Sequence, residues 1–231
     1  MTLPVLETPI YELILPSTNK KVKYRPFLVK EYKILLTNVE TDAAEISRIV
    51  LELVDNCTFK TLNINKLAHF DVEYLFLNIR AKSISETTNL VVNCDCGNKI
   101  DHAMDLTKVK VKKDKNINNK ILINDDIGVI MRYPRFDEIV EIHDDNNNEH
   151  IISLVCNCID SVYTKDKVYE RDSFTNEELE NFVNTFTKKQ FDKLEEFFKY
   201  IPKIVHEINE VCPACNRINQ VVLEGLQNFF V

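Results

Sequence analysis

The sequence predicts an α+β protein in which two cysteine hairpins, far apart along the chain, form one zinc-ribbon-like module. Strand-like alternation occurs near the N-terminus, in the middle and near the C-terminus, while helical periodicity with capping signals fills the regions between. The 231 residues are 45% hydrophobic and 28% charged, an ordinary globular composition. We expect four regions (1–86, 87–134, 135–202 and 203–231) in one compact domain, with the ribbon split in sequence.

The first region, 1–86, is predicted to be a β-hairpin followed by three helices. Two strand-like runs between Ile10 and Pro26 flank a Pro-Ser-Thr-Asn turn. Helical patterns follow over 29–39, from near Asp42, and over 65–82, the last apolar nearly all round and therefore central. The first two should bury one face each: Tyr32, Leu35, Leu36 and Val39; then Ile46, Ile49, Val50 and Leu53.

The remaining regions alternate between strand-like and helical patterns. Region 87–134 is β-rich, with strands around the first cysteine turn and at 108–113, 120–123 and 128–133. Region 135–202 is predicted to be helical, at 136–142, at 149–162, and after two capping boxes. The two capping boxes are Thr175 with Glu178 and Thr187 with Gln190. Region 203–231 returns to strands around the second cysteine turn. No internal repeat is evident.

Composition excludes several function classes. Three isolated glycines provide no Gly-rich phosphate loop. A net charge of −7 argues against a broad nucleic-acid surface, and we interpret the lysine run at 108–115 as a solvated edge. We therefore expect no nucleic-acid partner. No apolar run suits a bilayer span, and the start does not resemble a signal peptide, so we expect no membrane partner either. The expected compartment is a reducing cytoplasm, where cysteines bind metal or are simply buried.

Four cysteines carry the sharpest prediction: Cys94, Cys96, Cys212 and Cys215. Cys-Pro-Ala-Cys between strands is a zinc-knuckle pattern, and Cys-Asp-Cys-Gly is the other cysteine pair on a strand–turn–strand. Structural Zn²⁺ takes four such ligands, so the two turns should close one site. The Cys-x-Cys half departs from the usual Cys-x-x-Cys. Buried thiols, a redox pair and an iron–sulfur cluster are the alternatives, with His102 as the substitute ligand.

The other candidate groups point to no enzyme. Cys156 and Cys158 fall in a helical pattern, where one should be buried and the other exposed, and Cys57 should be core. Asp125-Asp126 and Asp144-Asp145 lack the spacing of a calcium loop. No nucleophile elbow is present. An interaction or structural protein is therefore predicted, with Phe229-Phe230 as core or as a docking element.

Several segments resemble the T4-like bacteriophage baseplate hub subunit family. They are Leu15 to Leu36, the strand Asp126 to Pro134, the cysteine turns and the Phe-Phe ending. The resemblance implies a structural or assembly role in a contractile tail's baseplate hub, with hub and tail proteins, including the tape measure protein, as partners. It implies the host cytoplasm during assembly, the virion baseplate if the protein is retained, and no catalytic residues. The alternative is a zinc-ribbon factor that binds nucleic acid or serves host takeover.

Overall fold

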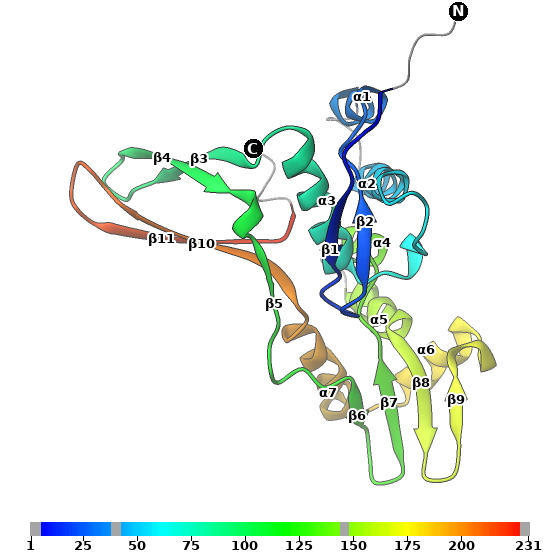
Figure 1. Ribbon diagram of the computed structural model, residues 1–231. Helices are drawn as coiled ribbons and strands as arrows, with labels where there is room; N and C mark the ends of the chain where they lie inside the picture. The colour runs from blue at the N-terminus through cyan, green and yellow to red at the C-terminus, as the bar shows by residue number, and fades with distance from the viewer. Residues whose placement is uncertain (1–5, 38–42, 144–147, 227–231) are drawn as a thin grey trace, which may run out of the picture. The chain divides into compact units, whose positions relative to one another are not determined.

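The computed structural model describes residues 6–37, 43–143 and 148–226, and it confirms a mixed α+β protein (Figure 1). The chain divides into two compact units. Unit 1 comprises Met1–Lys112 and Lys203–Val231, and unit 2 is Lys113–Pro202. Unit 2 is therefore inserted in the sequence of unit 1. Among the described residues, no helix is both long and apolar enough to cross a membrane.

Unit 1 begins with the predicted hairpin and its three helices. Strands β1 (Tyr11–Ile14) and β2 (Lys21–Tyr24) pair antiparallel. Helices α1 (Val29–Thr37), α2 (Ala43–Cys57) and α3 (His69–Ser83) follow, with a 3₁₀ turn η1 (Ile64–Lys66) before the last. Helix α3 is the centre of the unit, as predicted, because apolar side chains on several of its faces are buried: Phe70, Val72, Leu75, Phe76, Leu77 and Ile79.

The rest of unit 1 is two antiparallel sheets. Strands β3 (Thr87–Asn93) and β4 (Lys99–Asp105) form the first cysteine hairpin. Strands β10 (Lys203–Val211) and β11 (Ile218–Glu224) form the second, and β5 (Lys110–Lys112), after the 3₁₀ turn η2 (Leu106–Lys108), pairs with β10 in the order β11-β10-β5. The β5–β10 pairing joins residues on either side of the inserted unit 2. This pairing lets the two hairpins belong to one unit.

Unit 2 has a four-stranded antiparallel sheet in the order β6-β7-β8-β9. Its strands are β6 (Lys120–Leu122), β7 (Ile127–Met131), β8 (Ile159–Thr164) and β9 (Val168–Glu170). Its helices are α4 (Phe136–His143), α5 (Asn148–Asn157), α6 (Asn176–Asn184) and α7 (Lys188–Lys199), with the 3₁₀ turn η3 (Arg171–Ser173). Both predicted capping boxes are present at α6 and α7.

The structure corrects the prediction for 135–202, which is not wholly helical. Helix α5 ends at Asn157, and the β8–β9 hairpin follows. Cys156 and Cys158 are therefore both buried, because Cys158 lies beyond the helix and escapes the helical face rule.

Three side chains predicted to be buried are exposed: Tyr32, Leu36 and Ile46. Helix α1 thus turns part of its apolar face to solvent. Val39, Asp144-Asp145 and Phe229-Phe230 lie outside the described residues.

Candidate metal centre

The first cysteine turn is held in shape by its own backbone. The N–H of Cys94 donates to the carbonyl of Asn98 (2.9 Å), and the N–H of Gly97 donates to the carbonyl of Cys94 (2.8 Å). Gly97 has φ +87°, a conformation that is costly for a residue with a Cβ. The tight turn lets Cys94 and Cys96 point to the same place although they are only two residues apart.

The second turn repeats this arrangement at the end of β10. The N–H of Cys212 donates to the carbonyl of Arg217 (2.8 Å), and the N–H of Asn216 donates to the carbonyl of Cys212 (2.9 Å). Asn216 takes the left-handed conformation, φ +56°, which asparagine tolerates better than most residues. The β3–β4 and β10–β11 hairpins therefore both end in a turn that presents two thiols.

The two turns bring all four predicted cysteines together. Their sulfur atoms lie within 4.8 Å of one another, with Cys94 Sγ to Cys215 Sγ at 3.7 Å and Cys96 Sγ to Cys212 Sγ at 3.6 Å. A tetrahedron with Zn–S bonds of about 2.3 Å has S–S edges of about 3.8 Å. Disulfide sulfurs lie at about 2.05 Å, so these are free thiols. The donor set and its spacing fit a tetrahedral thiolate site.

Crowding of the thiols moves the pKa values of Cys212 and Cys96 in opposite directions. Burial alone would raise the pKa of Cys212, but the N–H groups of Cys215 and Ala214 and the neighbouring thiols lower it to about 6. The N–H of Asn98 favours the Cys96 thiolate, yet the other three cysteines raise its pKa to about 12. Four thiolates cannot share this space without a compensating charge, and a divalent cation supplies one.

Charged groups surround the cluster without entering it. Arg217 Nη1 lies 2.9 Å from Asp95 Oδ2, an exposed ion pair that joins the two turns. His102 Nδ1 lies 2.6 Å from Glu210 Oε1 and therefore bridges β4 to β10. His102 was the predicted substitute ligand, and its place is in this bridge rather than among the four sulfurs.

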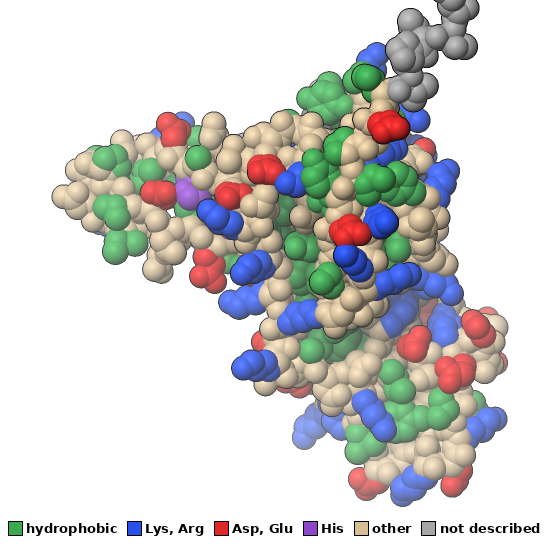
Figure 2. All heavy atoms as spheres, in the orientation of Figure 1, with side chains coloured by type: hydrophobic (Ala, Val, Ile, Leu, Met, Phe, Trp, Pro, Cys, Tyr) green, Lys and Arg blue, Asp and Glu red, His purple; other side chains and the backbone are tan. Residues whose placement is uncertain are grey.

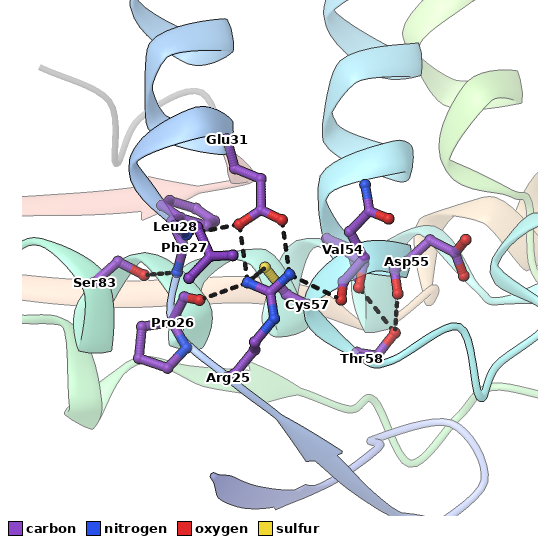
Figure 3. Close-up of polar contacts among 11 residues, drawn as sticks. Arg25, Pro26, Phe27, Leu28, Glu31, Val54, Asp55, Cys57, Thr58 and Ser83 are labelled. Atoms are coloured by element: carbon purple, nitrogen blue, oxygen red, sulfur yellow. Dashed lines mark hydrogen bonds and ion pairs between the residues drawn. The ribbon is translucent and has the colours of Figure 1, made fainter. Parts of the chain in front are cut away.

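Sequence reasoning missed a second polar cluster, at the start of α1 (Figure 3). Arg25 Nη1 and Nη2 bind the two oxygens of Glu31 at 2.9 and 2.7 Å, and Nη1 also donates to the carbonyl of Pro26. The backbone N–H of Arg25 donates to the carbonyl of Cys57 (3.0 Å), and burial raises the pKa of the Cys57 thiol to about 12. The ion pair itself is almost fully buried. Only the Arg-to-Glu spacing of six residues hints at it in the sequence.

Comparison with known proteins decides the family. Residues 8–231 match the family model described as T4 bacteriophage base plate protein. The chain belongs to this family. The chain is similar in sequence to the baseplate hub assembly protein gp26 of Enterobacteria phage T4. The two are 24% identical over 213 residues, which cover 92% of this chain and 93% of that protein. No solved structure matches the chain significantly. The family match includes both units and both cysteine turns.

Proposed function

We propose that this protein is a structural or assembly component of the baseplate hub of a contractile phage tail, acting through protein–protein contacts. The observation that carries the proposal is the family match, which runs through both units rather than through one motif. The related T4 protein is named for baseplate hub assembly. The expected partners are other hub and tail proteins, including the tape measure protein, and no residue is assigned a catalytic role.

Exposed apolar side chains on the second hairpin support contacts with protein. Val211 and Ile218 face each other across β10 and β11 and are 56% and 64% exposed. Val222 is on the same face of β11 and is also exposed. Exposed apolar side chains grouped on one face of a hairpin suit a protein partner better than water.

The four cysteines are proposed to hold one structural Zn²⁺. All four ligands would be protein thiolates: Cys94, Cys96, Cys212 and Cys215. Such a set leaves no open position for a water or a substrate, so the ion would stabilise the fold rather than perform chemistry. Its role would be to join the β3–β4 and β10–β11 hairpins, which are otherwise linked by side-chain contacts such as His102 to Glu210.

The charge distribution favours protein contacts over nucleic acid. Both acidic and basic side chains are present on the face shown in Figure 2, and the basic ones are more frequent in part of it. Within the lysine run, Lys108 Nζ lies 3.3 Å from Asp105, and Lys112 Nζ lies 3.7 Å from Glu207. Neighbouring carboxylates reduce the field that a phosphate backbone would meet.

Affinity purification of the tagged protein from infected cells tests this function. We expect hub and tail proteins to co-purify, with nuclease treatment leaving the yield unchanged. Mass spectrometry of purified virions then separates a stable component, present in stoichiometric amounts, from an assembly factor that leaves. DNA binding that falls steeply with salt, with no tail protein recovered, would contradict the proposal and favour the nucleic-acid alternative.

The hairpin surface supplies a sharper variant. Val211→Glu should reduce the recovery of tail proteins while leaving the thermal unfolding temperature unchanged, because the side chain is already exposed. Val168→Glu is the matched control, since Val168 is a similarly exposed valine on strand β9 of unit 2. Equal recovery with both variants would assign the contacts to another surface.

A further inference from the structure

The buried Arg–Glu cluster of unit 1 has a counterpart in unit 2. Arg132 Nη1 and Nη2 bind the two oxygens of Glu138 at 2.9 and 2.6 Å, and Nη1 also donates to the carbonyl of Tyr133. The backbone N–H of Arg132 donates to the carbonyl of Cys158 (2.8 Å). Each of these bonds has its equivalent at Arg25, Glu31 and Cys57.

The two clusters sit at the same place in the local sequence. In both, arginine directly follows the second strand of a hairpin, and glutamate comes six residues later. The same glutamate accepts from the backbone N–H three residues before it, at Leu28 (2.6 Å) and at Arg135 (2.7 Å). Arginine, capped residue and glutamate are all separated from their counterparts by 107 residues (25 to 132, 28 to 135, 31 to 138).

The order of elements around the clusters is also the same. A hairpin leads into a helix, a second helix ends at or just before the buried cysteine, and a 3₁₀ turn then precedes a third helix. In unit 1 these are β1, β2, α1, α2, η1 and α3, and in unit 2 they are β6, β7, α4, α5, η3 and α6. The buried cysteines, Cys57 and Cys158, differ by 101 positions, and the 3₁₀ turns, Ile64–Lys66 and Arg171–Ser173, differ by 107.

Buried positions in the hairpins correspond as well. Val22 and Tyr24 are buried on β2, and Val129 and Met131 are buried at the matching positions of β7. The copies differ in length on both sides of the cysteine. Glu31 and Cys57 are 26 residues apart, but Glu138 and Cys158 are only 20 apart. Unit 2 then places the β8–β9 hairpin between its cysteine and its 3₁₀ turn, where unit 1 has a short connection.

We infer that residues 11–83 and 120–184 are two copies of one folding module. An Arg–Glu pair closes each copy, almost fully buried in the first and partly buried in the second. The pair ties the end of the hairpin to the first turn of the next helix, and the arginine N–H ties it to the end of the helix after that. The repeat escapes inspection of the sequence because it consists of spacing and a few polar residues, while the apolar residues between them vary.

The repeat also bears on what the clusters do. An arginine, a glutamate and a buried cysteine in one place resemble a reactive site. The same arrangement at equivalent positions of both copies indicates a structural role instead. The thiols agree with this interpretation, because burial raises the pKa of both Cys57 and Cys158 to about 12 and keeps them protonated at neutral pH.

Hydrogen exchange measured by mass spectrometry on the full-length protein tests the inference. Glu31→Gln removes one half of the first pair and should speed exchange at least tenfold in peptides from β2 and α1, leaving β7 and α4 unchanged. Glu138→Gln should do the reverse. The magnitude follows from leaving an arginine buried without its partner. Glu52→Gln is the control, because its exposed carboxylate pairs with Arg48 at 3.7 Å on the surface of α2.

Conservative variants keep the test decisive if the glutamine proteins do not fold. Arg25→Lys and Arg132→Lys retain the charge but lose the two-pronged contact, and each should open its own copy in the same pattern. The inference is overturned if either pair of variants speeds exchange throughout both units alike. It is equally overturned if substitutions at Arg132 or Glu138 leave β7 and α4 as protected as in the unmodified protein.

Discussion

Replacing one cysteine of the cluster should release the proposed zinc ion. Cys212→Ser removes one of four thiolates from a site whose sulfurs already lie at tetrahedral spacing. Structural zinc binding in small domains is worth about 10–16 kcal/mol, so a quarter of it is about 2.5–4 kcal/mol. At 1.4 kcal/mol per decade, zinc affinity should fall by two to three orders of magnitude. Stability in excess zinc should fall by a similar free energy, because the metal binds only the folded state.

The assay combines metal analysis with unfolding. Protein purified without added zinc should carry about one equivalent by plasma mass spectrometry, and the variant should carry much less after dialysis against a weak chelator. Cys156→Ser is the matched control: this thiol is equally buried but lies outside the cluster, so stability should fall while zinc content stays at one equivalent. Full metal retention in Cys212→Ser and in Cys94→Ser would refute the four-cysteine site.

Three further predictions concern single residues of the two units. Burial raises the pKa of Glu73 to about 7 although its carboxylate accepts from the N–H of Leu226, so the folded state binds its proton more tightly than the unfolded chain does. The free energy of unfolding should therefore fall as the pH rises from about 4.5 to 7, by at most about 3 kcal/mol. Urea unfolding of Glu73→Gln should show a flatter dependence on pH. An unchanged pH profile in this variant would exclude Glu73 as its source. A Cβ added at Gly128 would overlap the ring of Tyr163, so Gly128→Ala should cost about 1–3 kcal/mol, and Tyr163→Ala should remove most of that cost in the double variant. Independent costs in the double-mutant cycle would contradict the clash. Gly97→Ala meets no neighbouring atom but must keep φ near +87°, so it should cost about 1 kcal/mol without loss of zinc stoichiometry; complete loss of metal would show a larger rearrangement of the turn.

Local signals predicted much of this fold. The cysteine turns, the capping boxes and the apolar helix α3 depend on residues close together in sequence, and all of them are present in the structure. The ends of β8 depend instead on pairing with β7. Residues Ile152, Val155, Cys156 and Ile159 continue a helical spacing, so nothing local marks the change to a strand at Ile159.

Buried charges were the other failure of prediction. The sequence pattern pointed to no role for Arg25 or Arg132, because an arginine is rarely buried unless paired and neither partner is evident locally. Their partners become recognisable only when the strand end, the first helical turn and the end of the second helix are brought together. For the candidate site, the sequence predicted which four cysteines lie together, and the structure added the sulfur spacing and the bridge between His102 and Glu210.

The split of the cysteine pairs across the inserted unit has a consequence for synthesis. Cys96 and Cys212 are 116 residues apart, so the first pair leaves the ribosome well before the second exists. At about 5–20 residues per second, that interval lasts roughly 6–23 s. During this time unit 2 is made and can fold, while the proposed metal site has only two of its four cysteines. Metal capture would then mark a chain whose synthesis has passed Cys215, and a product truncated before Cys212 would lack two of the four proposed ligands.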